Sequence, residues 1–248
     1  MARVRFVGHA TVLVELDGVR LLTDPLLRRR VAHLRRVTPI QMDDLRRPDA
    51  VLLSHAHYDH LDVSSLRRLD RTALAVVPNG LGPFLRRLGF ERIAELEAGD
   101  EVDVRGVTVR ATPADHDSER VFGVRTEAIG FALLGSRRAF FAGDTDLFPE
   151  LEGLVEELDV ALLPIWGWGA KLGRGRHLDP EKAAEAVRLL QPRVAIPIHW
   201  GTYAPLHRTL FGMPAFATSP AAAFELAVRR RAPGVDVRIL APGESLEL

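Results

Sequence analysis

The chain has 248 residues, of which 47% are hydrophobic, and its 33 basic and 33 acidic residues give a formal net charge of zero. This length and apolar content allow one large core, so we expect a single domain over residues 1–248. The charge balance argues against a general binder of polyanions and so disfavours nucleic acid as a partner. The chain has no cysteine, which excludes disulfides and thiolate ligands, so any metal must be held by imidazole and carboxylate groups.

The N-terminal residues and the apolar runs predict a cytoplasmic location. Residues 1–5 lead directly into a strand pattern, without the apolar core and cleavage site of a signal peptide. No apolar stretch approaches the length of a transmembrane span. The absence of cysteine also suits a reducing compartment.

The first half of the chain predicts a β-meander followed by alternating strands and helices. Asp17-Gly18 is a typical hairpin turn, and the wholly apolar run 50–53 is typical of a strand buried on both faces. Short helices are expected at 63–69 and 81–88. Strands are expected at 4–7, 12–16, 19–22, 50–53 and 74–77.

The second half has the same order, with a β-rich stretch followed by alternating strands and helices. Turn signals at Arg105-Gly106 and Gly135-Ser136 divide the β-rich stretch. Two β-rich stretches, each followed by helices, fit an α/β fold with two mixed β-sheets packed face to face and helices outside. Strands are expected at 102–104, 107–112, 128–134, 138–141, 159–163, 194–198 and 235–240, and helices at 180–190 and 220–230.

Three imidazoles and one carboxylate lie within six residues, directly after the buried strand at 50–53. Alternate residues of an extended segment point the same way, so His55 and His57 can meet one ion. A following turn would aim Asp59 and His60 toward a second ion. The alternative is a solvated loop, which does not explain such a density of histidines at a strand end. The cluster therefore predicts a metal site.

This segment resembles the HxHxDH motif of the metallo-β-lactamase superfamily, and residues that resemble its other motifs follow in order over almost the whole chain. His116, Asp144 and His199 each follow a β run, as the ligands of the superfamily do. The resemblance implies a four-layer αββα sandwich with a site for two divalent ions. It implies that His55, His57 and His116 hold one ion, that Asp59, His60 and His199 hold the other, and that Asp144 bridges them.

Three further segments resemble motifs of the subgroup that contains N-acyl-phosphatidylethanolamine phospholipase D and L-ascorbate-6-phosphate lactonase. They are Gly8-His9-Ala10-Thr11, Leu22-Thr23-Asp24-Pro25 and His177-Leu178-Asp179-Pro180-Glu181. We expect His9 either to pack a turn beside the site or to contact substrate. We expect Asp24 to accept the second N–H of a ligand imidazole, which would fix the tautomer of that ligand.

His177 is a candidate for a role in substrate binding and catalysis. Asp179 is a natural N-cap with Pro180 at the first helical position, so His177 lies beside a helix N-terminus that favours anions. An imidazole there can hold an anionic substituent or assist the leaving group. The alternative is a histidine that is hydrogen-bonded within its own loop.

The loop 164–176 is rich in glycine, aromatic and basic residues, and it is a candidate lid over the site. We expect Trp166 and Trp168 to form walls of a substrate pocket and Lys171 to contact an anion. The alternative is a surface loop whose tryptophans pack on the core.

Arginines are concentrated in residues 28–47, among scattered apolar residues. This stretch either contacts phosphate groups of a nucleic acid or a membrane surface, or forms a solvated insertion after the Asp24-Pro25 turn. The zero net charge favours the insertion. The apolar segment 210–214 is either an interface of a homo-oligomer or a wall of the pocket.

The ligand set and the resemblance together predict a metal-dependent hydrolase of a small-molecule substrate. A hydroxide between two ions would attack a small ester, lactone or phosphodiester, with Asp59 orienting the hydroxide and His177 binding an anionic substituent. Imidazole and carboxylate ligands suit zinc, which is our first expectation, and they also suit manganese or iron.

Three other functions are alternatives. Nucleases of the superfamily usually have an added nucleic-acid-binding domain or arm, and this chain has no segment of that length or charge. Redox di-iron proteins of the flavodiiron type resemble this chain, but they have a carboxylate at the position of His57 and an appended flavin domain. A non-catalytic metal-binding protein would keep the fold without turnover, which the full ligand set disfavours.

Overall fold

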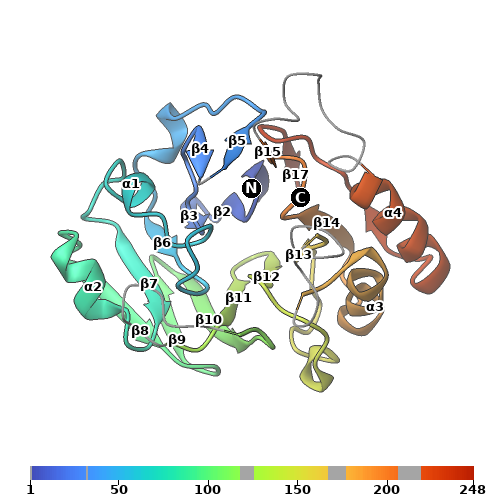
Figure 1. Cartoon of the computed structure of the whole chain (residues 1–248). Coiled ribbons are helices and arrows are strands. Elements are labelled where there is room, and N and C mark those ends of the chain that lie inside the picture. Colours follow the sequence, from blue (N-terminus) through green and yellow to red (C-terminus); the bar gives the residue numbers. More distant parts are fainter. Residues whose placement is uncertain (1, 32, 118–125, 167–176, 206–218) are drawn as a thin grey trace.

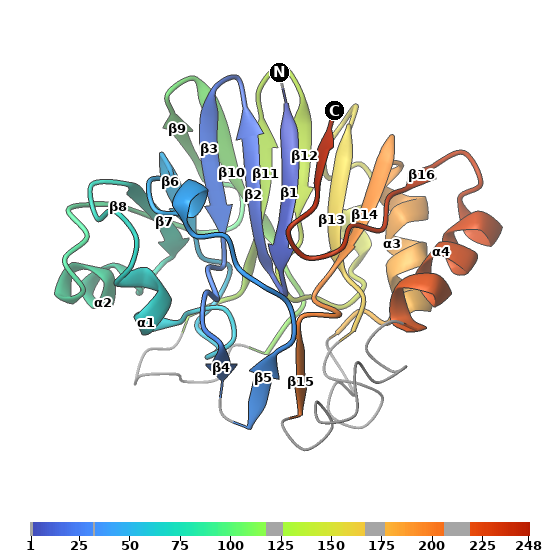
Figure 2. The ribbon, with the colours of Figure 1, turned by 90° about the horizontal axis from the view of Figure 1, so that it is seen from above.

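The computed structural model describes residues 2–31, 33–117, 126–166, 177–205 and 219–248. Two large β-sheets pack face to face, with α1 (Val63–Leu66) and α2 (Gly82–Arg87) on one flank and α3 (Pro180–Leu190) and α4 (Ser219–Arg231) on the other (Figure 1). The view from above shows the strands of both sheets between these two pairs of helices (Figure 2). The predicted α/β fold, with two mixed sheets face to face and helices outside, is confirmed.

The first sheet has seven strands in the order β17-β1-β2-β3-β6-β7-β8. The first three strands of the chain form the predicted antiparallel meander, and β6, β7 and β8 continue the sheet in parallel with β3. Asp17 and Gly18 have φ angles of 52° and 80°, as their hairpin turn requires. The bounds are β1 Arg3–Gly8, β2 Thr11–Leu16, β3 Val19–Thr23, β6 Ala50–Leu52, β7 Leu74–Pro78, β8 Arg92–Leu96 and β17 Ser245–Glu247.

The second sheet also has seven strands, in the order β16-β14-β13-β12-β11-β10-β9. The strands from β9 to β12 are antiparallel, and β12, β13, β14 and β16 are parallel. Each sheet is therefore mixed. Helices or loops connect the parallel strands of each sheet to one another. The bounds are β9 Glu101–Val104, β10 Val107–Pro113, β11 Ile129–Leu134, β12 Arg138–Phe141, β13 Val160–Pro164, β14 Val194–Ile198 and β16 Asp236–Val237.

The alternation of side chains along β2 divides the core into two layers. Val12 and Val14 belong to the hydrophobic cluster between the sheets, which also contains Phe131 of the second sheet. Leu13 points the other way, into a cluster that includes Leu66 of α1. Because successive side chains of a strand point to opposite faces, the first sheet buries both of its faces.

The sequence patterns miss a small third sheet and misplace the end of the chain. The arginine-rich stretch forms β4 (Arg30–Val31) and β5 (Leu34–Arg36), and β5 pairs with β15 (Tyr203–Pro205). The strand expected at 235–240 is wrong in its length, because β16 covers only two of those residues. After a turn at Pro242-Gly243 the chain joins the first sheet as β17, beside β1.

Candidate metal centre

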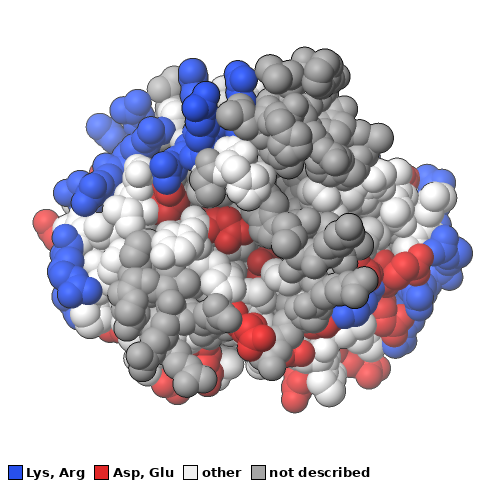
Figure 3. Space-filling view, in the orientation of Figure 1, with Lys and Arg blue, Asp and Glu red and all other residues white. Residues whose placement is uncertain are grey.

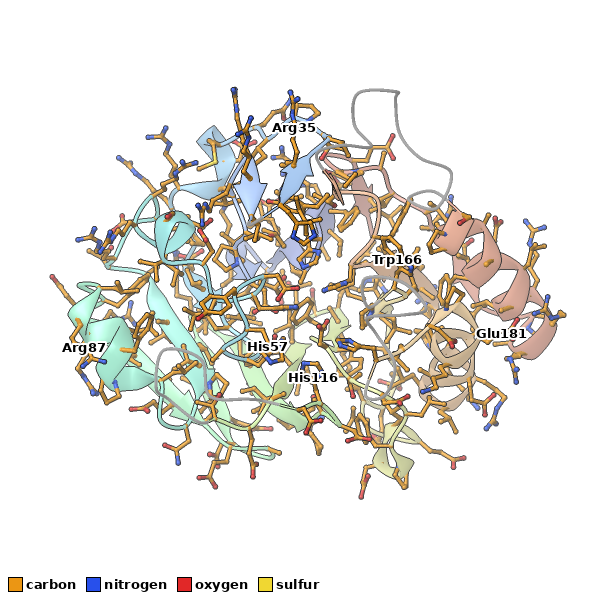
Figure 4. All side chains as sticks on the ribbon, viewed as in Figure 1. Arg35, His57, Arg87, His116, Trp166 and Glu181 are labelled. Carbon is orange, nitrogen blue, oxygen red and sulfur yellow. The ribbon has the colours of Figure 1, made fainter. Side chains whose placement is uncertain are left out.

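The predicted ligands follow strand ends of both sheets. His55, His57, Asp59 and His60 come after β6 of the first sheet, whereas His116, Asp144 and His199 follow β10, β12 and β14 of the second sheet. Loops at the carboxyl ends of parallel strands are a common place for active sites in layered α/β folds. In Figure 4, His57 and His116 lie near the centre of the view, whereas Arg35, Arg87 and Glu181 lie at the periphery.

Three imidazoles from two sheets form the first cluster. The distance from His55 Nε2 to His57 Nδ1 is 3.0 Å, and the distance from His116 Nε2 to His57 Nδ1 is 3.1 Å. One nitrogen of each ring therefore points to a common centre, and the three ligand atoms lie within 4.8 Å of one another. Three imidazoles arranged in this way fit one face of a divalent metal ion.

A second cluster lies beside the first. Asp59 Oδ2 is 3.8 Å from His60 Nε2, 3.7 Å from His199 Nε2 and 3.2 Å from His9 Nε2. Asp144 extends between these groups, with Oδ2 3.3 Å from His60 Nε2 and Oδ1 3.5 Å from His199 Nε2. The structure thus brings together all seven residues that the sequence predicts as ligands, and it adds His9 to the second cluster.

Three of the histidine rings have a hydrogen-bond partner at the nitrogen that faces away from the cluster. These nitrogens are Nδ1 of His55, His60 and His199. Asp24 Oδ2 lies 2.7 Å from His60 Nδ1 and 2.5 Å from Ser54 Oγ. The Ser54 hydroxyl in turn lies 2.9 Å from His55 Nδ1, and the carbonyl of Trp166 lies 2.9 Å from His199 Nδ1. When these Nδ1 atoms carry the proton, the Nε2 atoms keep their lone pairs for a cation.

Three residues of the site have a left-handed backbone conformation. The φ angle is 57° at His9, 63° at His199 and 30° at Asp24. The backbone N–H of His199 donates to the carbonyl of His9 at 2.8 Å, and the N–H of His9 donates to Thr202 Oγ1 at 2.7 Å. Residues other than glycine keep this conformation only where surrounding contacts hold it, and such strain often marks functional sites.

The donor atoms fit a divalent cation. Among the described residues, His60 Nε2 and Asp144 Oδ1 are buried without a hydrogen-bond partner, which is costly unless another group occupies the space between them. Although burial opposes it, the neighbouring His199 and His60 lower the pKa of Asp144 well below its usual value. Burial and the neighbouring His60 lower the pKa of His55 well below its usual value. An ionised carboxylate and a neutral imidazole are the forms that bind metal.

Three carboxylates near His60 favour positive charge at this place. Burial lowers its pKa, but Asp144, Asp59 and Asp24 together raise that pKa well above the usual value. A metal ion held by Nε2 of the neutral imidazole would balance the same negative charge. The cluster is therefore built to hold positive charge.

His177 lies beside the first cluster. Its Nδ1 is 3.6 Å from Asp144 Oδ2, and its ring centroid is 4.7 Å from that of His116. Helix α3 begins just after it, and Asp179 Oδ1 caps this helix by accepting the N–H of Lys182 at 2.9 Å. Burial lowers the pKa of His177 from its usual value. The residue is thus placed between the predicted ligands and a helix N-terminus.

The pocket side chains of the predicted loop are only partly described. The side chain of Trp166 packs against the main core, and its carbonyl bonds His199. Trp168 and Lys171 lie outside the described residues, as does the apolar segment 210–214. The roles of these residues in binding substrate or a second subunit stay predictions.

The arginine-rich stretch has both a buried and an exposed part. Arg36 is buried, and its guanidinium donates to the carbonyls of Val7, Leu26 and Thr38. Arg28 pairs with Asp62 at 3.1 Å. Other basic side chains gather over the side of the molecule that carries β4, β5, α1 and α2 (Figure 3). Within the described residues, no helix is long and apolar enough to cross a membrane.

Sequence reasoning missed the serine and threonines that support the site. Ser54 bonds Asp24 and His55, Thr202 accepts the N–H of His9, and Thr145 follows Asp144 directly. Serine and threonine are common residues, so their type alone carries little information about a site. For Ser54 and Thr145, the one available signal is their position next to a predicted ligand.

Comparison with known proteins identifies the family of this chain. Residues 19–200 match the Beta-lactamase superfamily domain. A UPF0173 metal-dependent hydrolase of Methanopyrus kandleri is 33% identical over 99% of this chain and 99% of its own length. The N-acyl-phosphatidylethanolamine-hydrolyzing phospholipase D 1 of Caenorhabditis elegans is 30% identical over 80% of this chain and 63% of its own length.

A solved structure has the same fold over the whole chain. It is Igni18, a metallo hydrolase from the archaeon Ignicoccus hospitalis, with a TM-score of 0.73 and 25% identity over 100% of this chain and 99% of that one. The fold, the match over most of the chain and the relatives of full length agree with one another. The chain therefore belongs to the metal-dependent hydrolases of the metallo-β-lactamase superfamily.

Proposed function

We propose that this hydrolase uses two divalent metal ions to cleave a small ester, lactone or phosphodiester that carries an anionic group. The observation that carries the proposal is the position of Asp144 between two clusters. One of its oxygens lies 3.3 Å from His60 Nε2 and the other 3.5 Å from His199 Nε2, while the same carboxylate is 3.6 Å from His177, beside the first cluster. A carboxylate in this position can serve ions on both sides.

Each of the two ions would have its own set of ligands, with one carboxylate shared between them. Zinc is our first choice of metal, with manganese or iron as alternatives, because imidazole and carboxylate ligands suit all three. When bound, two such ions supply Lewis acidity and lower the pKa of a water held between them. His55, His57 and His116 would hold the first ion, Asp59, His60 and His199 the second, and Asp144 both.

Two side chains are proposed to act on the reacting groups. Asp59 is partly exposed, unlike the buried His60 and Asp144, so its carboxylate can accept a hydrogen bond from the attacking water and orient it. His177 is half-buried with a lowered pKa, which leaves its imidazole neutral near pH 7. A neutral His177 can donate an N–H to the leaving oxygen or to an anionic substituent at the start of α3.

The substrate class follows from the site and from one relative. The relative from Caenorhabditis elegans is named for hydrolysing a phospholipid at a phosphodiester bond. A phosphodiester carries the negative charge that the N-terminus of α3 and His177 would favour. We therefore place phosphodiesters first among the candidate substrates and lactones second.

The test combines a metal count with a substrate panel. Protein purified without added metal should contain about two metals per chain by elemental analysis, and the same preparation should hydrolyse a chromogenic phosphodiester or a member of a lactone panel. Asp144→Ala should lose both metal loading and hydrolysis. Asp236→Ala removes an exposed carboxylate of β16 that pairs with Arg238, and this variant should lose neither metal loading nor hydrolysis.

Each outcome has a clear meaning. Full hydrolysis by Asp144→Ala, or a wild-type chain that stays metal-free after reconstitution, would overturn the proposal. Hydrolysis of lactones without phosphodiesters would keep the two-metal site and correct the substrate class.

A further inference from the structure

Thr145 touches three segments that each carry a residue of the candidate metal centre. It directly follows Asp144 in the chain, and it is 1% exposed. Its hydroxyl accepts the backbone N–H of Asp115, the residue before His116, at 2.9 Å. Its carbonyl accepts the backbone N–H of Leu178, the residue after His177, at 2.8 Å. One residue therefore contacts the chain neighbours of His116 and His177 and is itself the neighbour of Asp144.

The three residues that Thr145 connects also lie together in space. Single ligand atoms of His116, Asp144 and His177 lie within 4.8 Å of one another. They come from different parts of the fold, after β10, after β12 and before α3. Nothing in the covalent chain keeps these segments in register, so their spacing depends on the contacts between them.

The hydroxyl of Thr145 is the most specific of these contacts. It donates to the carbonyl of Asp146 at 2.8 Å while it accepts from Asp115, so both of its hydrogen-bonding functions are used inside the protein. A single backbone bridge runs beside it, because the N–H of Asp146 donates to the carbonyl of Asp115 at 2.8 Å. The hydroxyl and this backbone bond thus together hold the His116 loop beside the Asp144 loop.

A salt bridge extends the same connection to helix α3. Lys182 Nζ lies 2.8 Å and 2.6 Å from the two carboxylate oxygens of Asp146, and the backbone N–H of Lys182 is capped by Asp179. This pair is partly exposed and by itself worth little. It nevertheless ties the start of α3 to the residue that the Thr145 hydroxyl already binds.

We propose that Thr145 is a positioning residue of the metal centre, whose hydroxyl sets the spacing of His116, Asp144 and His177. The inference rests on the proposed function, because it assumes that these residues meet metal and substrate. Groups that hold ligands in place typically contribute about 10–100-fold to metal affinity. Loss of the hydroxyl should therefore weaken metal binding without removing any ligand.

The experiment adds zinc to metal-free protein in the presence of a zinc-binding dye. Competition between protein and dye gives the dissociation constant of zinc from the protein. Thr145→Val keeps the branched shape but replaces the hydroxyl by a methyl group, so its dissociation constant should rise about 10–100-fold. Thr145→Ser keeps the hydroxyl and should restore wild-type affinity. Should the valine variant fail to fold, Thr145→Ala removes the same hydroxyl without placing a methyl group against two polar atoms.

Two controls separate positioning from loss of stability. Thr112 of β10 is 2% exposed, and within the described residues its hydroxyl has no hydrogen-bond partner, so Thr112→Val makes the same change without breaking a bond. Ser65 of α1 is fully buried and its hydroxyl makes two hydrogen bonds, so Ser65→Ala should lower the melting temperature without changing metal affinity.

The possible results are distinct. Weak binding by Thr145→Val with recovery in Thr145→Ser supports the inference. Wild-type affinity in Thr145→Val, or equally weak binding in Thr145→Ser, would overturn it. A wild-type chain that binds no zinc would instead overturn the proposed function, so the two failures cannot be confused.

Discussion

Asp24 shows at the scale of one residue how a carboxylate outside the ligand set can control a ligand. It is fully buried, Oδ1 accepts the N–H of Ser54 at 2.7 Å, and Oδ2 lies 2.7 Å from His60 Nδ1. Asp24→Asn would place an amide group among donors that need an acceptor. We expect its metal affinity to fall about 10–100-fold in the dye competition assay.

The control for Asp24 is another carboxylate that accepts a backbone N–H. Asp49 accepts the N–H of Arg20 at 2.9 Å and pairs with Arg105, but it contacts no predicted ligand. Asp49→Asn should therefore affect the thermal midpoint alone. Equal metal affinity in Asp24→Asn and the wild-type protein would show that Asp24 serves the fold and not the ligand.

Residues with rare chemistry were predictable from the sequence, and common residues were not. Histidines after apolar runs indicate a site, because imidazole is seldom placed there for packing alone. Ser54 and Thr145 act through one hydroxyl each, and their partners depend on segments that only the fold brings together. His9 was predicted beside the site, but its approach to Asp59 depends on a left-handed turn that no pattern specifies.

At the scale of elements, Arg36 joins the small third sheet to the first sheet. Its guanidinium donates to the carbonyls of Val7, Leu26 and Thr38, and it lies 5.7 Å from the ring centroid of Tyr203 on β15. Arg36→Met would leave these buried carbonyls without their donor, so we expect the free energy of unfolding to fall by about 2–4 kcal/mol in urea titrations.

The neighbouring arginine provides a matched control. Arg35 lies on the same strand but is exposed, so Arg35→Met should change the free energy of unfolding by less than about 0.5 kcal/mol. A similar loss in both variants would mean that net charge, and not the buried hydrogen bonds, is what the third sheet requires.

A second element-scale prediction concerns pH. The side chain of Asp17, in the β2–β3 turn, accepts hydrogen bonds from the backbone and the hydroxyl of Ser136, in the β11–β12 turn, which joins hairpin tips of the two sheets. These bonds lower the pKa of Asp17. A carboxyl with a lowered folded pKa stabilises the fold fully above its unfolded pKa of about 3.9, and it loses that contribution as pH falls through the folded pKa.

The measurement compares wild type with Asp17→Asn. The wild-type protein should have the higher urea midpoint at pH 7, and the difference should shrink below about pH 4. Ser136→Ala should remove part of the same difference. A difference that stays constant from pH 7 to pH 3 would assign the effect to the turn conformation of Asp17, whose φ is 52°, and not to its charge.

The regular strands and helices were predictable, whereas the short polar strands were not. Strands such as β2 and β13 have long runs of apolar residues, and helix α3 has both an N-cap and a buried face. β5 is mostly polar, and of its two partner strands, β4 and β15, the second is far along the chain. Such pairing is a property of the fold, so local patterns cannot report it.

At the scale of the whole molecule, the candidate centre joins the two sheets. His55, His57, Asp59 and His60 belong to a loop of the first sheet, and the other predicted ligands follow strands of the second. A bound ion would therefore connect both halves of the fold, while in its absence several buried carboxylates and imidazoles face one another. Metal should then stabilise the protein against unfolding as well as support hydrolysis.

The last prediction follows from this arrangement. A ligand that binds only the folded state at a thousand times its dissociation constant adds about 4 kcal/mol. For a protein of this size each kcal/mol raises the melting temperature by about 2–4 °C, so removing metal with a chelator should lower it by about 8–16 °C. Calorimetry of chelated and reloaded protein measures the shift, which should reverse on adding zinc.

The origin of that shift can be assigned with one ligand variant. His116→Ala removes a predicted ligand from the second sheet but leaves the cluster after β6 intact, so its melting temperature should respond much less to chelation than that of the wild-type protein. Its shift is measured against its own metal-free form, because His116 is only 9% exposed and its truncation also leaves a cavity. A full wild-type shift in His116→Ala would mean that the stabilising ion lies outside the centre described by His55, His57 and His116.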